Sequence, residues 1–162
     1  MTRLEHDRED LMREATALVR RVEVRLPGDS QTCVVGFRRG GEASVFVGSD
    51  PVFQFNTAGE LRRGFWNGRL VKAERGRLVQ LERRRTEAEV QLVRHELTET
   101  QMLDFVQLAT ETLNLLRRAL QTGELVVVKQ VPADVNVLFD LATWLDSLPQ
   151  PLAIASAPNV RT

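Results

Sequence analysis

The sequence predicts an α+β domain: an antiparallel β-meander of five to six strands, from about residue 32 to residue 97, flanked by an N-terminal helix and two C-terminal helices with a strand between them. Apolar residues recur at helical spacing near both ends of the chain, and short β-rich segments alternate with turn residues between them. The dipeptide Asn67-Gly68 is a strong hairpin signal. A length of 162 residues suits one domain, which we assign to residues 1–148, with residues 149–162 as a flexible tail.

The N-terminal segment has the pattern of an amphipathic helix over residues 2–22, with charged side chains between regularly spaced apolar ones. These apolar positions are Leu4, Leu11, Ala15, Leu18 and Val22. From Val22 to Leu26 apolar and charged residues alternate, and Pro27 and Gly28 follow. We therefore expect the helix to give way to a short strand or turn at this point.

Turn residues predict the register of the meander. Both central residues of a type I′ turn need positive φ, which Asn and Gly tolerate, so Asn67-Gly68 is expected to join two strands directly. This turn pairs Phe65 with Leu70. Near the start of the meander, Gly40-Gly41 is expected to pair its two flanking residues in the same way.

The next two turns extend this register. Arg75-Gly76 closes a hairpin that sets Leu70 opposite Leu81, and a two-residue loop at Thr86-Glu87 then sets Leu81 opposite Leu92. A slip of one residue would send each side chain to the other face, so an all-apolar row supports the three turns together. The row, which we interpret as the core row, reads Phe65, Leu70, Leu81 and Leu92.

A long helix is expected to begin at Thr98. The Thr98 hydroxyl can cap the helix, and Gln101 can complete a capping box. The helix should end just before Gly123, which suits a C-cap. Residues 124–131 then predict a buried strand, and Pro132 is expected to open the last helix.

Composition indicates a cytoplasmic location without membrane association. Acidic and basic residues number 22 each, 43% of the residues are apolar, and no apolar segment is long enough to span a bilayer. The single cysteine, Cys33, cannot form an internal disulfide. The first 25 residues are densely charged and do not resemble a signal peptide.

No motif for a nucleotide, a metal or a catalytic nucleophile occurs in the sequence. His6, His95 and Cys33 could supply at most three zinc ligands, at a spacing unlike that of known zinc sites. We therefore expect no cofactor, no metal and no catalytic residue, and we interpret Cys33 as a core residue.

Three cations form the first candidate site. The expected register puts Arg63, Lys72 and Arg94 in one row beside the apolar row. Like charges on neighbouring strands destabilise a sheet, so this row requires solvent, acidic side chains of the same chain, or an anionic partner. The acidic helix after residue 98 is one source of such side chains, and nucleic acid is one external anion.

Apolar residues on the opposite face of the meander form the second candidate site. Trp66, Val71 and Val93 lie among polar side chains there. If the helices cover only the other face, this mixed patch is a candidate for contact with another protein or with a second copy of the chain.

The leading functional hypothesis is therefore a noncatalytic protein-interaction module, with homodimerisation as one form of it. The alternatives are binding of nucleic acid or another polyanion by the basic strands, and a small enzyme without a recognisable motif. The order of helix, meander, helix, strand and helix resembles that of secretion-chaperone-like domains, and this resemblance implies a dimer that binds partner proteins.

Overall fold

The computed structural model describes residues 8, 10–11, 19–26, 28, 32–48 and 52–156. These residues form a nine-stranded sheet in the order β8-β7-β6-β5-β4-β3-β2-β1-β9, and every neighbouring pair of strands is antiparallel. The strands are β1 (Arg20–Arg25), β2 (Thr32–Phe37), β3 (Ala43–Val47), β4 (Val52–Phe55), β5 (Leu61–Trp66), β6 (Arg69–Glu74), β7 (Arg77–Arg85), β8 (Val90–Glu96) and β9 (Val126–Val131). The helices whose bounds the structure describes are α2 (Glu99–Thr122) and α3 (Val137–Ser147).

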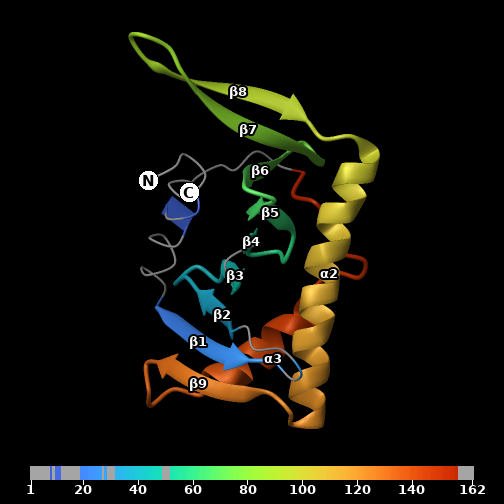
Figure 1. The fold of residues 1–162 in the computed structure, drawn as a ribbon. Helices are drawn as coiled ribbons and strands as arrows, with labels where there is room; N and C mark the ends of the chain where they lie inside the picture. The colour runs from blue at the N-terminus through green and yellow to red at the C-terminus, as the bar shows by residue number, and fades with distance from the viewer. Residues whose placement is uncertain are drawn as a thin grey trace.

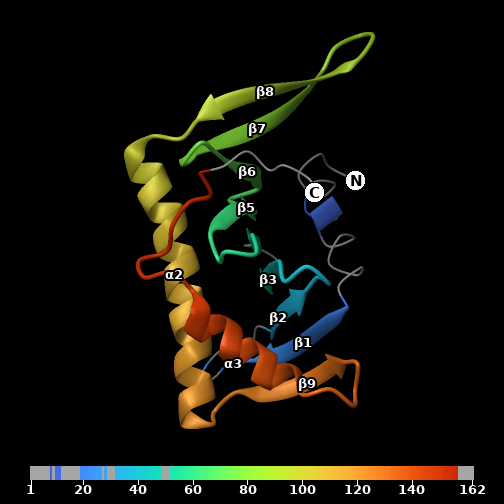
Figure 2. The same cartoon turned by 180° about the vertical axis from the view of Figure 1, so that it is seen from behind.

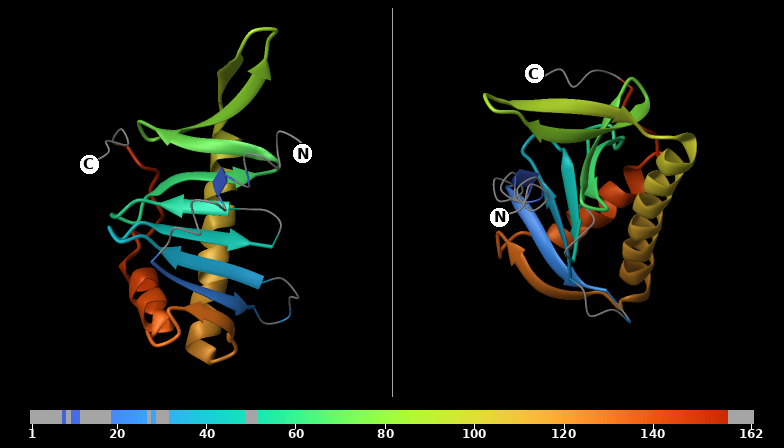
Figure 3. Two further views of the ribbon diagram at one scale, coloured as in Figure 1. Left: turned by 90° about the vertical axis from the view of Figure 1, so that its left-hand side faces the viewer. Right: turned by 45° about the horizontal axis from the view of Figure 1, so that its top comes forward.

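Both helices lie on one face of the sheet, which we call the inner face (Figure 1). α2 runs across the strands from the β7 end to the β9 end, and α3 packs beside it near β1 (Figure 2). The left view of Figure 3 shows the opposite, outer face, with α2 behind the strands. At one end of the sheet, β7 and β8 extend beyond the central strands as a hairpin, whose residues 82–95 we call the arm.

The predicted fold class is wrong in its content of strands and helices. The sheet has nine strands instead of a meander of five to six, because residues 32–96 alone form seven strands, β2 to β8. The meander also begins earlier than predicted, at β1, where Val22 and Val24 are fully buried. The strand expected between the C-terminal helices, β9, joins the same sheet beside β1. The predicted helix over residues 2–22 lies mostly outside the described residues; residues 8, 10 and 11 within it are helical, and its last three positions belong to β1.

The turns at the centre of the sheet have the predicted geometry. Asn67-Gly68 has φ angles of 52° and 71°, and Arg75-Gly76 has φ angles of 53° and 79°, as a type I′ turn requires. Phe65 therefore pairs with Leu70, and Leu70 pairs with Leu81, so both predicted registers are confirmed.

The predicted register at Gly40-Gly41 is wrong by one residue. The Arg38 N–H donates to the Glu42 carbonyl oxygen at 2.9 Å, so the loop holds three residues and not two. Gly41 has a φ of 96°, which is typical of a three-residue hairpin loop with glycine in its last position.

The loop between β7 and β8 is also longer than predicted. The backbone N–H of Thr86 donates to the carbonyl oxygen of Glu89 at 2.9 Å, which closes a four-residue turn. Arg83 consequently lies opposite Leu92, and Leu81 lies opposite Arg94. The last step of both predicted rows is therefore wrong.

The row interpreted as the core row faces away from the helices. Its members Phe65 and Leu70 lie on the outer face, where Leu11 covers them in a small second core together with Phe46 and Val52. Leu92 is 61% exposed. The side chains beneath α2 are the alternate ones, whose buried members include Val71 on β6 and Leu78 on β7.

α2 begins and ends as its sequence predicts. The Thr98 hydroxyl accepts from the Gln101 backbone N–H at 3.1 Å, and the Gln101 side-chain oxygen accepts from the Thr98 N–H at 2.9 Å, which completes the capping box. Gly123 adopts the left-handed conformation at the C-cap. β9 is not buried, however, and α3 begins five residues after Pro132, with Asn136 as its N-cap.

The inner core is centred on Phe105 of α2, which is fully buried against the rings of Phe53 and Trp66. Gly64 lies directly beneath it, because a Cβ atom there would lie 2.8 Å from the Phe105 ring. At the α3 end, Trp144 packs edge-on against the rings of Phe37 and Phe55.

Residues beyond α3 return to the sheet. Ala155 donates its N–H to the carbonyl oxygen of Leu61 at 2.9 Å, and the Leu61 N–H donates to the carbonyl oxygen of Ala153 at 2.8 Å. Ala155 is buried, so this part of the expected tail packs against β5. The remainder of that tail, residues 157–162, lies outside the described residues.

Candidate functional site

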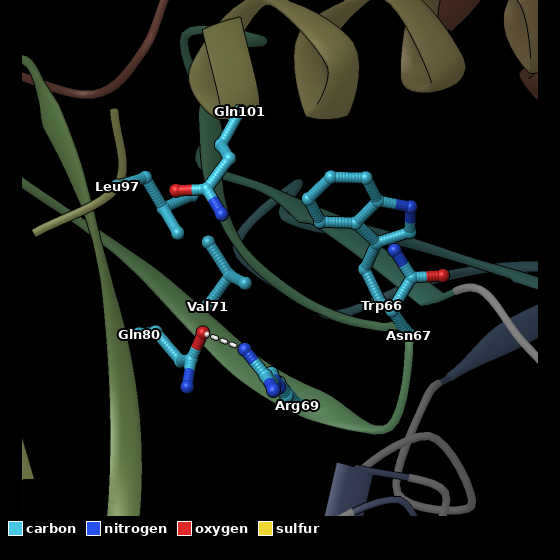
Figure 4. Close-up of a pocket in the computed structure, with 7 residues that line it drawn as sticks. All are labelled: Trp66, Asn67, Arg69, Val71, Gln80, Leu97 and Gln101. Atoms are coloured by element: carbon cyan, nitrogen blue, oxygen red, sulfur yellow. Dashed lines mark hydrogen bonds between the residues drawn. The ribbon is translucent and has the colours of Figure 1, made fainter. Parts of the chain in front are cut away.

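A pocket of about 290 Å³ opens on the inner face, where the β5-β6 hairpin meets the start of α2 (Figure 4). Its apolar lining consists of Trp66, Val71 and Leu97. The Trp66 ring is held from behind by Phe105, at a centroid distance of 5.4 Å. We call this cavity the Trp66 pocket.

Four polar residues complete the lining of the Trp66 pocket, namely Asn67, Arg69, Gln80 and Gln101. Trp66 and Arg69 are paired across the type I′ turn, so both side chains point to the inner face. Gln80 lies opposite Val71 on the next strand, and its side-chain oxygen accepts a hydrogen bond from Arg69 at 3.0 Å. Gln101 enters from the first turn of α2. The pocket thus gathers side chains from three strands and one helix.

The predicted cationic row is only partly assembled. Arg63 and Lys72 are directly opposed on the outer face, but Arg94 lies in the neighbouring row. Arg63 donates to the side-chain oxygen of Gln54, and Arg94 contacts the carboxylate of Glu74.

Several cations of the outer face pair with acidic residues that do not belong to α2. α2 covers the inner face, so its acidic residues lie on the other side of the sheet from Arg63 and Lys72. Acidic partners on the outer face include Glu74 for Arg94, Asp10 for Arg83 at 3.5 Å and Glu96 for Arg77 at 3.7 Å.

The predicted apolar contact patch is divided between two sites. Trp66 and Val71 line the pocket, and Val71 is almost fully buried beneath α2. Val93 lies on β8 in the arm, opposite Glu82 of β7. The three residues therefore share the inner face without forming one contact surface.

The arm carries charged side chains of both signs and exposed apolar side chains. Its outer face presents Val90 and Leu92, which are 56% and 61% exposed. On its inner face Glu82 accepts hydrogen bonds from Arg84 at 3.3 Å and from His95 at 3.1 Å. The hydrogen bond from Arg84, and then that from His95, lowers the pKa of the Glu82 carboxyl group.

The sheet has two open edges, β8 and β9. β9 exposes three consecutive valines, Val126, Val127 and Val128, at 53%, 39% and 46%. Its pairing with β1 is interrupted by a bulge between Glu23 and Val24. β8, in contrast, pairs with β7 without a register shift along its whole length.

Reactive side chains are sparse in the described part of the chain. Cys33 is fully buried in β2, and this burial raises the pKa of its thiol to about 12, so the thiol stays protonated at neutral pH. No group of three potential metal ligands occurs among the described residues. Neither of the described helices combines the length and apolar character needed to cross a bilayer.

No protein-family model matches the chain, and no curated protein or solved structure gives a significant match. Its chemistry must therefore be inferred from the pocket, the arm and the two sheet edges.

Two parts of the Trp66 pocket can be predicted from the sequence, but their proximity cannot. The Asn67-Gly68 turn and the capping-box Gln101 are both visible in the sequence. Their proximity depends on which face of the sheet α2 covers, and turn residues carry no information about that choice.

Proposed function

We propose that the protein is a noncatalytic protein-interaction module that pairs with a second copy of itself along strand β8. The observation that carries this proposal is the exposure of Val90 and Leu92, at 56% and 61%, on an open edge of the sheet. An open edge presents unpaired backbone N–H and C=O groups, which makes it a template for another strand.

β8 is less protected against pairing than the other edge. Natural sheets protect their edges with bulges, lysines and prolines. β9 has all three features, because its ladder with β1 contains a bulge, it includes Lys129, and Pro132 directly follows it. β8 has a regular register and contains neither lysine nor proline. We therefore assign the association to β8, although β9 also exposes valines.

The sequence of β8 suits an antiparallel pair around a twofold axis. With Leu92 opposite its own counterpart, Val90 lies opposite the partner's Arg94, and His95 lies opposite the partner's Glu89. The central contact is then apolar, and the turn residue Glu89 of one copy lies near His95 of the other at each end of the pair. This self-complementary pattern favours a second copy of the chain over an unrelated strand.

The arm is accessible to a partner because it extends beyond the central strands (Figure 3). Pairing would unite the exposed Val90 and Leu92 of both copies on one continuous outer face. An interface built mainly from two short strands is small, and interfaces of this class are weak. We therefore expect a dissociation constant on the order of 10 µM.

The test is the replacement of Leu92 by lysine, with light scattering measured from low to high micromolar concentration. We expect the wild-type chain to become dimeric as its concentration rises and Leu92→Lys to remain monomeric, because an edge lysine must be desolvated on pairing. The matched control is Leu103→Lys on α2, where the leucine is 68% exposed, and this variant should dimerise normally.

Three outcomes would contradict the β8 pairing. A wild-type chain that stays monomeric at the highest concentration excludes it. A dimer that Leu92→Lys leaves intact and Val126→Lys breaks assigns the contact to β9. An equal loss of the dimer in Leu92→Lys and Leu103→Lys indicates a general effect of added charge.

Binding of nucleic acid or another polyanion has less support. Residues 82–96 contain four arginines and four glutamates, so the net charge of this segment is zero apart from His95. The arginines are Arg83, Arg84, Arg85 and Arg94, and the glutamates are Glu82, Glu87, Glu89 and Glu96. A labelled oligonucleotide titrated at low salt should therefore give no saturable change in anisotropy. Saturable binding that Arg63→Gln and Lys72→Gln weaken would contradict this expectation.

A further inference from the structure

The side-chain oxygens of two glutamines that border the Trp66 pocket already accept hydrogen bonds. The side-chain oxygen of Gln101 accepts the backbone N–H of Thr98, and the side-chain oxygen of Gln80 accepts an N–H of Arg69. An amide whose oxygen is fixed in this way has its NH₂ group left to donate. Figure 4 shows the Gln101 amide nitrogen turned toward Val71, on the pocket side.

Among the described residues that line the pocket, Arg69 alone carries a formal charge. Its hydrogen bond to Gln80 uses one of five N–H donors and leaves the others for a ligand. None of the seven lining residues is acidic. A ligand that enters the pocket therefore meets a cation and amide N–H donors, and this combination selects a group that accepts hydrogen bonds and carries negative charge.

The opposite side of the pocket is apolar and firmly supported. The Trp66 indole packs against the fully buried Phe105, and Val71 and Leu97 are both at least 94% buried, since their exposures are 1% and 6%. These side chains offer contact area to an aliphatic or aromatic group without rearrangement. A volume of about 290 Å³ lies at the lower end of the range for small-molecule sites, so the ligand should be small.

We propose that the Trp66 pocket binds a small organic carboxylate, with the carboxylate on Arg69 and the Gln101 amide and the apolar part against Trp66. The proposal is independent of the β8 pairing, because β8 contributes no lining residue to the pocket.

The identity of residue 101 gives the proposal a sharp test. At the third helical position glutamate completes a capping box as well as glutamine does, and its charge is favourable near a helix N-terminus. Gln101→Glu therefore preserves the helix start. The same substitution replaces an N–H donor in the pocket with an anionic oxygen, which should repel a carboxylate.

The experiment is a titration of the full chain with benzoate and with hexanoate, followed through the indole N–H signals in a proton–nitrogen correlation spectrum. The sequence contains two tryptophans, Trp66 and Trp144, and the second lies at the other end of the inner core as an internal reference. We expect a saturable shift of the Trp66 signal and a constant Trp144 signal. Trp66→Phe assigns the two signals.

The neutral amides of the two acids are the ligand controls. Benzamide and hexanamide have the same shape without the charge, so they should bind at least about tenfold more weakly, the effect expected from losing a hydrogen bond between charged groups. Gln101→Glu and Arg69→Gln should weaken benzoate binding by a similar factor, while their thermal unfolding midpoints stay near that of the wild type.

Several results would overturn the carboxylate assignment. Equal binding of each acid and its amide would show that the pocket recognises only the apolar part of the ligand. Undiminished benzoate binding by Gln101→Glu would show that the Gln101 amide does not contact the carboxylate. A shift that never saturates, or that moves both indole signals together, would show that benzoate does not bind in the pocket.

Discussion

Replacing Gly64 with alanine is expected to lower the free energy of unfolding by about 3 kcal/mol or more, a large fraction of the roughly 5 to 15 kcal/mol that is typical of a folded domain. A Cβ atom at this position would lie 2.2 Å from the carbonyl oxygen of Val52 and 2.8 Å from the ring of Phe105. The first contact is with backbone of the paired strand, which cannot move without breaking the β4-β5 ladder.

Chemical denaturation followed by far-ultraviolet circular dichroism measures this effect. Gly40→Ala is the matched control, because a Cβ atom at Gly40 meets nothing within 4 Å and its φ is not in the left-handed region. Its free energy of unfolding should stay within about 0.5 kcal/mol of the wild-type value. A Gly64→Ala variant as stable as Gly40→Ala would mean that neither the Val52 carbonyl nor the Phe105 ring lies as close to Gly64 as described.

Phe105→Ala is expected to cost about 3 to 5 kcal/mol of unfolding free energy, the range for a fully buried phenylalanine. The Phe105 ring lies 5.4 Å from both the Phe53 and the Trp66 ring centroids, so its removal leaves a cavity between α2 and two strands. Leu103→Ala, two residues away on the same helix, removes a side chain that is 68% exposed and should change stability little.

The double variant of Gly64 and Phe105 tests whether the two effects share a contact. Alanine at position 105 removes the ring that a Cβ atom at position 64 would strike, but leaves the carbonyl oxygen of Val52 in place. The loss of unfolding free energy in the double variant should therefore be smaller than the sum of the two single losses. The double variant should still be less stable than either single variant. Strict additivity would contradict the packing of Phe105 over Gly64.

Features that depend on a few neighbouring residues were predictable from the sequence. The Asn67-Gly68 and Arg75-Gly76 turns adopt positive φ, and their registers follow from that alone. The capping box between Thr98 and Gln101 is likewise complete within four residues.

The wrong registers come from loops whose residues do not determine their length. Gly40-Gly41 fits a two-residue turn as well as the end of a three-residue loop, and only the hydrogen bond between Arg38 and Glu42 distinguishes them. Residues 86–89 contain no glycine, so this segment lacks the residue that favours a two-residue turn.

The largest error in the predicted fold concerns which face of the sheet lies beneath α2. No short stretch of sequence contains the information that would correct it. Both faces of β5 and β6 carry apolar side chains, because Phe65 and Leu70 are covered by Leu11 while Val71 is covered by α2. The more apolar row in the sequence is therefore not the row beneath the long helix. The Trp66 pocket was missed for the same reason, since Trp66 shares the face of Val71.

The place of β9 beside β1 has a consequence for the chain during synthesis. Each pair from β1 to β8 is closed by a short connection, so the strands can pair in order as they emerge, with little loop entropy to overcome. Arg21 pairs with Val131, however, and must wait until α2 has been made. In the nascent chain β1 is therefore a sheet edge, and it contains Val22 and Val24. β9 later pairs with β1, and the new edge that β9 forms is better protected against pairing with other strands.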